Sequence, residues 1–137
     1  QEETGGFTGF VPFAFEPSQT KLAELGKIRR ASALEELRVI AASRLILDNF
    51  DHITAYWIST GLPLAQVALS YGADDLHGTI EEEKIFHMAG AKTPAGETRN
   101  NLERAIREAG REPVERNTYY EPVRKTGAGA VGAIRRA

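Results

Sequence analysis

Segments with the pattern of β-strands alternate with segments that have the pattern of helices, and this alternation most restricts how the chain can fold. Apolar, aromatic and β-branched residues typical of strands occupy residues 7–15 and 52–59. The segment "ADDL", residues 73–76, is predicted as a short third strand or strand end, and residues 112–122 as the last strand. Helical spacing or capping residues mark residues 32–49, 64–71 and 98–110, with a further helical turn or two at 81–88. Such alternation is typical of βαβ units, whose parallel strands are covered by helices.

The number of these units predicts an α/β fold that forms about half of a TIM-type (β/α) barrel. A complete barrel of this type needs roughly 250 residues, and this chain has 137. A doubly wound parallel sheet is the structural alternative, although the chain has no G-x-x-x-x-G-K-[ST] phosphate-binding motif. We expect the half barrel to span residues 1–121. Residues 122–137, which end in "GAGAVGAIRRA", are expected to form a flexible C-terminal tail.

Two of the helices are marked by capping residues. Ser32 and Glu35 have the S-x-x-E spacing of a capping box, and Thr98 is a typical N-cap residue. Helical spacing predicts a buried face of the first helix made of Leu34, Leu37, Ala41 and Leu45, widened by Ile40 and Leu47. In the later helix the same spacing predicts a face of Leu102, Ala105, Ile106 and Ala109.

The composition argues against several classes of function. With 17 Lys+Arg against 19 Asp+Glu the net charge is −2, which does not favour nucleic-acid binding. The apolar runs are far shorter than the roughly 20 residues of a membrane helix, so we expect no membrane contact and a cytoplasmic location. The chain has no cysteine. Disulfides, cysteine nucleophiles and thiolate-held zinc or iron–sulfur sites built from this chain alone are therefore excluded.

Acidic residues and histidines are concentrated in "YGADDLHGTIEEEKIFHMAGA", residues 71–91. His77 and His87 lie ten residues apart and match no H-x-x-x-H or H-E-x-x-H pattern, and the consecutive glutamates 81–83 would point in different directions on a helix. We therefore predict no metal site. Asp74 and Asp75 end a predicted strand, where barrel active sites lie, but adjacent strand residues face opposite sides. An Asx-type turn is an equally good interpretation of this pair.

Two further positions have both a structural and a functional interpretation. Trp57 lies in the predicted strand "AYWIS" and fits a core residue as well as a pocket residue. Glu16 directly follows "PFAF" and is either a residue at the mouth of the barrel or the first solvated residue of a loop. Pattern alone favours the core interpretation for Trp57 and leaves the question open for Glu16.

Three stretches of the chain resemble one known enzyme family. They are "GFTGFVPFAFEP", the long segment from "LRVIAASRLILDNF" to "GADDLHGTIEEEKIFHMAGA", and "AIREAGREPVERNTYY", which together cover roughly residues 4–121. They resemble the C-terminal half of the radical S-adenosylmethionine enzymes of the futalosine menaquinone pathway and of deazaflavin synthesis. The "DD", "GT" and "EEKIFHMAGA" motifs favour the aminodeoxyfutalosine synthase branch over the cyclic dehypoxanthine futalosine synthase and FO synthase branches.

The resemblance implies radical chemistry for the parent enzyme. Such enzymes use a [4Fe-4S] cluster to cleave S-adenosylmethionine, and in this branch the resulting 5′-deoxyadenosyl radical adds to an enolpyruvyl-benzoate. The cluster is held by a C-x-x-x-C-x-x-C motif, which this chain lacks because it has no cysteine. We therefore expect this chain to bind no cofactor alone and to be inactive by itself. A further departure is Glu16, at a position where histidine often follows "PLAF" in this branch.

The resemblance also implies candidate site residues. We expect no catalytic residue and no metal ligand in this chain, and six substrate-binding candidates that follow or end predicted strands: Glu16, Trp57, Ser59, Asp74, Asp75 and Thr79. Glu82 and His87 are expected to have structural roles in the loop after the third strand.

The chain is expected to be a piece of a longer protein, since its single methionine is Met88. A half barrel has two open sheet edges, and open edges favour pairing. The expected partners are therefore the missing N-terminal half of the barrel or a second copy of the chain, together with a small-molecule substrate. The alternative function is a non-catalytic interaction or binding domain that has kept half of the barrel.

Overall fold

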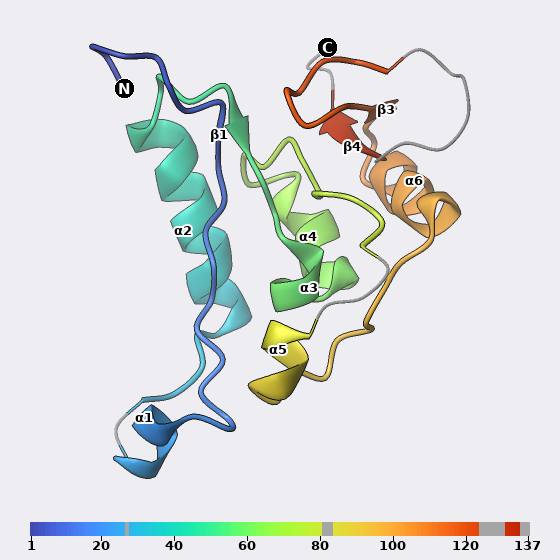
Figure 1. Ribbon diagram of the computed structural model, residues 1–137. Coiled ribbons are helices and arrows are strands. Elements are labelled where there is room, and N and C mark those ends of the chain that lie inside the picture. The colour runs from blue at the N-terminus through green and yellow to red at the C-terminus, as the bar shows by residue number, and fades with distance from the viewer. Residues whose placement is uncertain (27, 81–83, 124–130, 135–137) are drawn as a thin grey trace.

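The computed structural model describes residues 1–26, 28–80, 84–123 and 131–134, the last of these for the backbone alone. Short helices and strands alternate along most of the chain (Figure 1). The strands are β1 (Gly9–Phe10), β2 (His52–Ile53), β3 (Pro113–Glu115) and β4 (Val131–Ile134). The helices are α1 (Lys21–Glu24), α2 (Ala33–Ile46), α3 (Trp57–Thr60), α4 (Leu62–Ala68), α5 (Ile85–Met88) and α6 (Arg99–Glu108).

Three extended segments run parallel, which confirms the α/β class. Strands β1 and β2 pair in parallel, with Phe10 opposite Ile53. Thr54 forms a parallel bridge with Asp75, and the Ala55 amide donates to the Asp75 carbonyl oxygen over 2.8 Å. The regular ladder of β1 ends before Pro12, as expected for a residue that has no amide hydrogen to donate. Helices α1 and α2 connect the first two segments, and α3 and α4 connect the second to the third.

The fourth predicted strand forms, and its described partner is antiparallel. Strand β3 pairs with β4, with Val114 opposite Ala133 and an irregularity in register after Val114. Strand β4 lies within residues 122–137, for which we expected a flexible tail. The division of the chain after residue 121 stays a prediction.

The segment 52–59 was predicted as one strand, and the second half of that prediction is wrong. Pairing with the neighbouring segments ends at Ala55, and the chain then turns into the helices α3 and α4, which Gly61 connects with a φ of 82°. The β-branched and aromatic residues here satisfy burial rather than strand pairing, because Trp57 and Ile58 are fully buried on α3. Strand propensity largely reflects such burial, so it does not separate a strand from a short buried helix.

Helix α2 has the predicted capping box but a different buried face. The Ser32 hydroxyl accepts from the Glu35 amide, and the Glu35 carboxylate accepts from the Ser32 amide. The buried residues are Glu36, Leu37, Ile40 and Ser43. The predicted core positions Leu34 and Leu45 are instead 52% and 81% exposed. Apolar residues occur on both sides of this helix, so their spacing does not decide which side meets the sheet.

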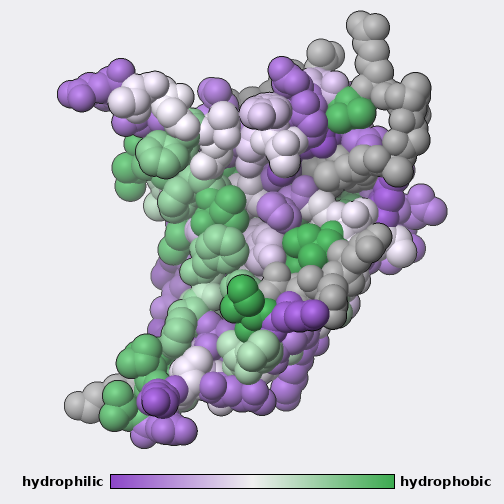
Figure 2. Space-filling model, in the orientation of Figure 1, coloured by the Kyte–Doolittle hydropathy of each residue, from purple (hydrophilic) through white to green (hydrophobic). Residues whose placement is uncertain are grey.

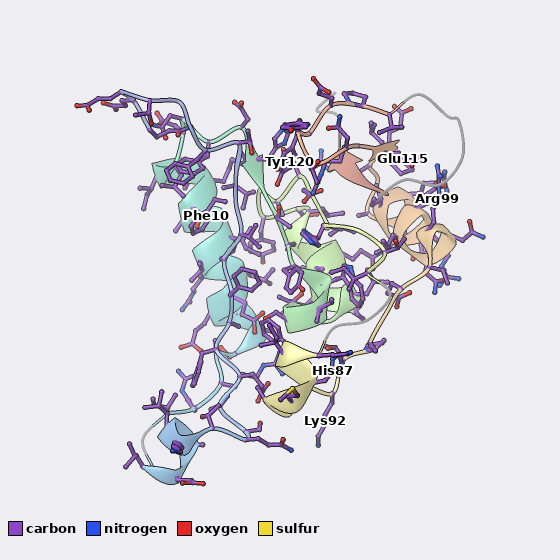
Figure 3. The ribbon with its side chains drawn as sticks, viewed as in Figure 1. Phe10, His87, Lys92, Arg99, Glu115 and Tyr120 are labelled. Atoms are coloured by element: carbon purple, nitrogen blue, oxygen red, sulfur yellow. The ribbon has the colours of Figure 1, made fainter. Side chains whose placement is uncertain are left out.

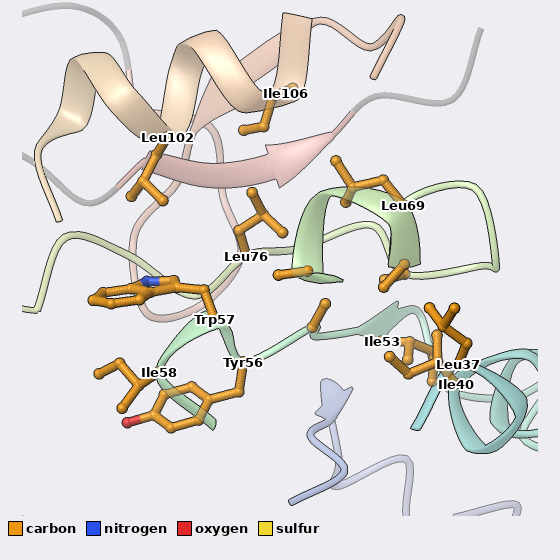
Figure 4. Packing of buried hydrophobic residues seen from close by; sticks show 14 residues of the cluster. Leu37, Ile40, Ile53, Tyr56, Trp57, Ile58, Leu69, Leu76, Leu102 and Ile106 are labelled. Atoms are coloured by element: carbon orange, nitrogen blue, oxygen red, sulfur yellow. The ribbon is translucent and has the colours of Figure 1, made fainter. Parts of the chain in front are cut away.

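The core lies between the parallel segments and the helices α2, α4 and α6. Figure 4 shows Ile53 of β2 packed beside Leu37 and Ile40 of α2, with Leu102 and Ile106 of α6 on the far side of Leu76. Thr98 caps α6 as predicted, and the predicted apolar face of α6 is confirmed by the burial of Leu102, Ala105 and Ile106. The cluster therefore joins residues from the parallel segments to residues of all three helices.

Replacing Leu102 by alanine should test how far the fold depends on this cluster. Leu102 is fully buried, so L102A should lower the free energy of unfolding by about 3 kcal/mol through lost burial and the cavity left behind. Urea unfolding followed by circular dichroism measures this loss. The matched control is L45A, which removes an exposed leucine from α2 and should change stability little. Equal losses for the two variants would contradict the described packing of α6.

Candidate functional site

The candidate site lies at the edge of the sheet where the three parallel segments end. The chain leaves β1 through residues 11–16, leaves β2 through residues 55–59, and leaves the third segment through residues 76–79. The N-terminus of α2 lies at the same edge, because α2 follows β1 through the loop that contains α1. Ligand sites of parallel α/β folds occur at this carboxyl edge.

Two predicted candidates, Glu16 and Ser59, are brought together by Arg30. The buried Glu16 carboxylate lies 3.2 Å from Arg30 Nη1. Arg30 Nη2 donates to the carbonyl oxygen of Ser59, so one guanidinium connects the end of the β1 segment to α3. Arg30 was missed in the sequence analysis because it lies in a long polar loop between Glu16 and Ala31, where no periodicity distinguishes it.

The environment of Glu16 favours its ionised form. The Ser18 hydroxyl donates to Glu16 Oε1, and this hydrogen bond is the largest cause of a lowered pKa. Burial opposes the lowering, while the Ser18 amide, 3.2 Å from Oε1, and the Arg30 charge add to it. Glu16 is therefore a buried carboxylate held by a guanidinium, rather than the first solvated residue of a loop.

Asp75 is fully buried and forms a bidentate ion pair with Arg116. Arg116 Nε lies 2.9 Å from Oδ1 of the aspartate, and Nη2 lies 2.8 Å from Oδ2. Oδ2 also accepts from the Thr54 hydroxyl over 2.8 Å and from the His77 amide over 3.2 Å. The Arg116 guanidinium lies over the Tyr120 ring, 4.0 Å from its centroid. Both oxygens of Asp75 are therefore engaged by groups of the chain itself.

Asp74 has a separate set of partners, as expected for neighbouring residues that face opposite sides of a strand. Its Oδ1 accepts from Arg44 over 2.8 Å and from the Ile53 amide over 2.7 Å. His52 Nδ1 lies 2.9 Å from Oδ2. Asp74 therefore ties the C-terminal half of α2 to β2. Direct contact of Asp74 or Asp75 with a substrate stays a prediction.

Trp57 and Thr79 lie close to one another along the carboxyl edge. Trp57 is fully buried, and its indole N–H donates to the Gly78 carbonyl oxygen over 2.7 Å. This bond holds the turn that carries Thr79, a partly exposed residue. Trp57 thus has the core role that its pattern allowed, and Thr79 is the more accessible of the two candidates.

An aromatic cluster at the same edge was not identified in the sequence analysis. The Tyr56 ring meets Phe13 edge-on at 5.0 Å and His77 edge-on at 5.2 Å between centroids. Phe86 lies 5.9 Å from Tyr56 and 6.0 Å from Phe13. His77 has a φ of 77°, a conformation uncommon for residues other than glycine. The four rings come from four separate segments, so only the fold assembles them.

At the opposite edge of the sheet, Tyr120 closes the space beside the strands. Figure 3 shows Tyr120 beside the upper ends of β1 and β2, away from α5, which carries His87. The Tyr120 ring stacks on His52 at 4.1 Å, and its hydroxyl lies 3.3 Å from the Thr54 hydroxyl. A side chain at Gly9 would collide with Tyr120, because an added Cβ would lie 2.6 Å from the Tyr120 hydroxyl oxygen. Glycine at this strand position therefore permits the close approach of the ring.

Among the described residues, no group of three or more His, Asp and Glu side chains is placed to hold a metal ion. His87, for which we expected a structural role, has Nε2 2.7 Å from the Thr93 carbonyl oxygen. Glu82 lies outside the described residues. The expectation that the chain binds no cofactor by itself stays a prediction.

Comparison with known proteins identifies the family of the chain. Residues 4–128 match the family model described as CofH/MqnC C-terminal region. The chain belongs to this family. It is 51% identical over 125 residues to an aminodeoxyfutalosine synthase of Thermus thermophilus, and 41% identical over 134 residues to one of Streptomyces coelicolor. A cyclic dehypoxanthine futalosine synthase of Streptomyces coelicolor is 42% identical over 123 residues.

These matches cover nearly all of this chain but a smaller share of the relatives. They include 90%, 91% and 88% of the chain, and 34%, 34% and 29% of the respective relatives. This CofH/MqnC C-terminal region therefore spans about a third of the length of the curated relatives it matches. The resemblance to the futalosine-pathway enzymes that the motifs indicated is confirmed. In the described part of this family member, no helix is long and apolar enough to cross a membrane.

The Asp75–Arg116 pair should contribute strongly to the stability of this family member. Replacing Arg116 by methionine leaves the buried Asp75 carboxylate without its cation, and such loss typically costs about 3–5 kcal/mol. We expect R116M to be destabilised by an amount in this range in urea unfolding. The double variant D75L/R116M should lose less stability than the sum of D75L and R116M, because it leaves no unpaired charge.

The control for this pair is Arg104, which lies 3.9 Å from Glu108 on the exposed side of α6. R104M removes a cation from a solvent-exposed pair and should change stability little. Strict additivity in the double variant D75L/R116M would show that the two buried groups do not interact, contrary to their geometry.

Because of Glu36, the free energy of unfolding should fall as the pH rises. Burial raises the pKa of the Glu36 carboxyl above its ordinary value of 4.5, although the charge of Arg30 opposes this. The folded chain therefore holds the proton more tightly than the unfolded chain, so this contribution to stability is full below the unfolded pKa. It is lost as the pH rises through the folded pKa. E36Q should remove this dependence.

The measurement is urea unfolding of wild type and E36Q between about pH 4 and about pH 8. The stability of E36Q relative to wild type should rise across this range. E24Q changes a glutamate on α1 and serves as the control, with a constant difference from wild type. A difference for E36Q that also stays constant would contradict the raised pKa.

Proposed function

We propose that this chain is the C-terminal, substrate-binding part of a radical S-adenosylmethionine aminodeoxyfutalosine synthase, an enzyme of menaquinone biosynthesis. The observation that carries the proposal is the 51% identity to the aminodeoxyfutalosine synthase of Thermus thermophilus across 90% of this chain. The cyclic dehypoxanthine futalosine synthase and a 4-hydroxyphenyl transferase of Methanoculleus marisnigri are 42% and 43% identical. The aminodeoxyfutalosine synthase is therefore preferred over the cyclic dehypoxanthine futalosine synthase and the 4-hydroxyphenyl transferase.

In this proposal, the three parallel segments are part of a (β/α) barrel completed by another part of the parent enzyme. Strand β1 pairs with β2 along one side, and among the described residues no strand pairs with its other side. The helices α2, α4 and α6 contribute to the core beside these segments, as the outer helices of a barrel do. The open side of β1 is then the place where the barrel continues.

The task of this chain in the proposed enzyme is to bind and position the substrate. Without cysteine it has no thiolate for a [4Fe-4S] cluster, so the residues of this chain do not fit that cofactor. Its polar groups at the carboxyl edge suit binding: the Glu16–Arg30 pair supplies fixed charges, and Thr79 supplies a partly exposed hydroxyl. Asp75 contributes indirectly, since it holds the His77 amide through Oδ2.

The surface of the chain supports an association with the N-terminal part of the parent. Apolar residues gather on the face of Figure 2 along the segment that follows β1 and down toward α1 and α5. Phe7, Phe13 and Phe15 of the N-terminal segment are 62%, 61% and 47% exposed, and Ile85 and Met88 of α5 are 79% and 75% exposed. Clustered exposed apolar side chains mark interaction surfaces.

A second candidate is a non-catalytic interaction domain built on the same fold. The absence of cysteine fits this candidate equally well, because a domain without the cluster needs no thiolates. The two candidates differ in whether this chain supports catalysis when the rest of the enzyme is supplied.

A chimeric enzyme tests the proposed function. Residues 4–128 of this chain would replace the corresponding region of the Thermus thermophilus aminodeoxyfutalosine synthase, which keeps its own N-terminal region. We expect the anaerobically reconstituted chimera to form aminodeoxyfutalosine, detected by mass spectrometry, because the transplanted region positions the same substrate. The matched control carries the corresponding region of the cyclic dehypoxanthine futalosine synthase and should not form this product. A folded, cluster-containing chimera without product would refute the proposal.

Association is tested separately on the chain itself. Size-exclusion chromatography with light scattering should show a complex when the chain is mixed with the N-terminal region of the synthase. Without that region we expect self-association through the same open side, because an unpaired strand edge favours pairing. Replacing Phe13 by glutamate, on the exposed apolar segment, should weaken both forms of association. If the chain stays a stable monomer and does not bind the added N-terminal region, the proposed partner is contradicted.

A further inference from the structure

A pocket with one buried acidic side chain lies beside the Glu16–Arg30 pair. Its volume is about 190 Å³, and it lies between the segment that follows β1 and the N-terminal half of α2. Apolar side chains form most of its walls, among them Phe13, Ala14, Phe15, Val39 and Ile40. Tyr56 and Thr60 close it on the side of α3, so the pocket opens at the carboxyl edge of the sheet.

Glu36 is one of the polar residues of this pocket, and one of its carboxylate oxygens has no partner among the described residues. Its side chain lines the pocket with only 9% of the residue exposed, and Oε2 has no hydrogen-bond partner among the described residues. Buried polar atoms are nearly always hydrogen-bonded, so each exception needs an explanation. A donor from outside the described residues would complete this carboxylate.

The polar neighbours of Glu36 are already engaged elsewhere. Arg30 contacts the Glu16 carboxylate and the Ser59 carbonyl oxygen. Glu35 accepts from Ser32 and from both terminal nitrogens of Arg29, so both of its carboxylate oxygens are engaged. Glu36 is therefore the acceptor that a molecule in the pocket would meet.

The dimensions and walls of the pocket limit what can bind. An engineered apolar cavity of about 150 Å³ takes up benzene, so about 190 Å³ has room for one six-membered ring and a short substituent. The Phe13 and Phe15 side chains offer aromatic surface to such a ring, and aromatic pairs favour stacked or edge-on contact. The Glu36 carboxyl disfavours an anionic ligand, whereas the charge of Glu35 is paired with Arg29.

We propose that this pocket binds a single aromatic or heteroaromatic ring that carries an N–H donor, with the N–H group donating to the Glu36 carboxylate. The ring lies between the apolar residues of the β1 segment and those of α2. This site belongs to the chain itself, and the inference holds whether or not the parent enzyme is an aminodeoxyfutalosine synthase. Its chemical class is that of small aryl amines and amino-heterocycles.

The test uses the full chain, labelled with ¹⁵N, and 2-aminopyrimidine as the probe. Titration followed by NMR should move the backbone amide signals of Ala14, Phe15, Glu36, Val39 and Thr60, which surround the pocket. In E36L the affinity for 2-aminopyrimidine should fall about tenfold, because the N–H group loses its buried acceptor. Toluene, which has the ring without the donor, should bind E36L at least as well as wild type. A loss of affinity for 2-aminopyrimidine in E36L, without a loss of affinity for toluene, would indicate a hydrogen bond to Glu36.

Two further variants separate the pocket from general effects on folding. V39F places a larger side chain at the pocket wall from a half-exposed position, and it should abolish binding of both probes while the spectrum stays that of a folded chain. E24Q alters an exposed glutamate on α1 and should bind both probes as wild type does. The proposal is overturned if 2-aminopyrimidine moves amide signals elsewhere, if it does not bind, or if E36L binds it as tightly as wild type.

Discussion

The buried ion pair between Asp75 and Arg116 is the interaction on which the arrangement of the chain depends. Asp75 belongs to the third parallel segment, whereas Arg116 directly follows β3, so the pair joins the parallel segments to the β3–β4 hairpin. Burying two charges is costly unless both are paired and hydrogen-bonded, and here Thr54 and the Tyr120 ring complete the environment. The pair also holds the carboxyl edge, because Asp75 accepts from the His77 amide.

The adjacent Asp74 shows how one strand can serve two sides of a sheet. Its contacts to Arg44 and His52 face α2 and β2, while Asp75 faces Arg116 and Tyr120. Side chains along a strand alternate between faces, so the two carboxylates have separate hydrogen-bonding partners. The acidic dipeptide, which first suggests a paired catalytic site, instead ties two different parts of the structure into place.

The sequence predicted which helices and strands form better than it predicted where they end and which residues they contact. The capping box at Ser32 and the apolar face of α6 could be read locally, because each depends on residues three or four positions apart. The turn at Trp57 and the exposure of Leu45 could not, because they depend on which surfaces meet in the folded chain. The arginine partners of Glu16 and Asp75 are 14 and 41 residues away along the chain, and no local pattern specifies them.

Glu16 and Glu36 show what the carboxyl edge is suited to do. Both are buried acids near Arg30, yet hydrogen bonds from Ser18 lower the pKa of Glu16, while burial raises that of Glu36. One carboxyl is thereby fully engaged, and the other has an oxygen without a partner among the described residues and lines an apolar pocket. Burial without a partner lowers stability, so a fold that retains Glu36 in this position is explained most simply by a ligand that completes it.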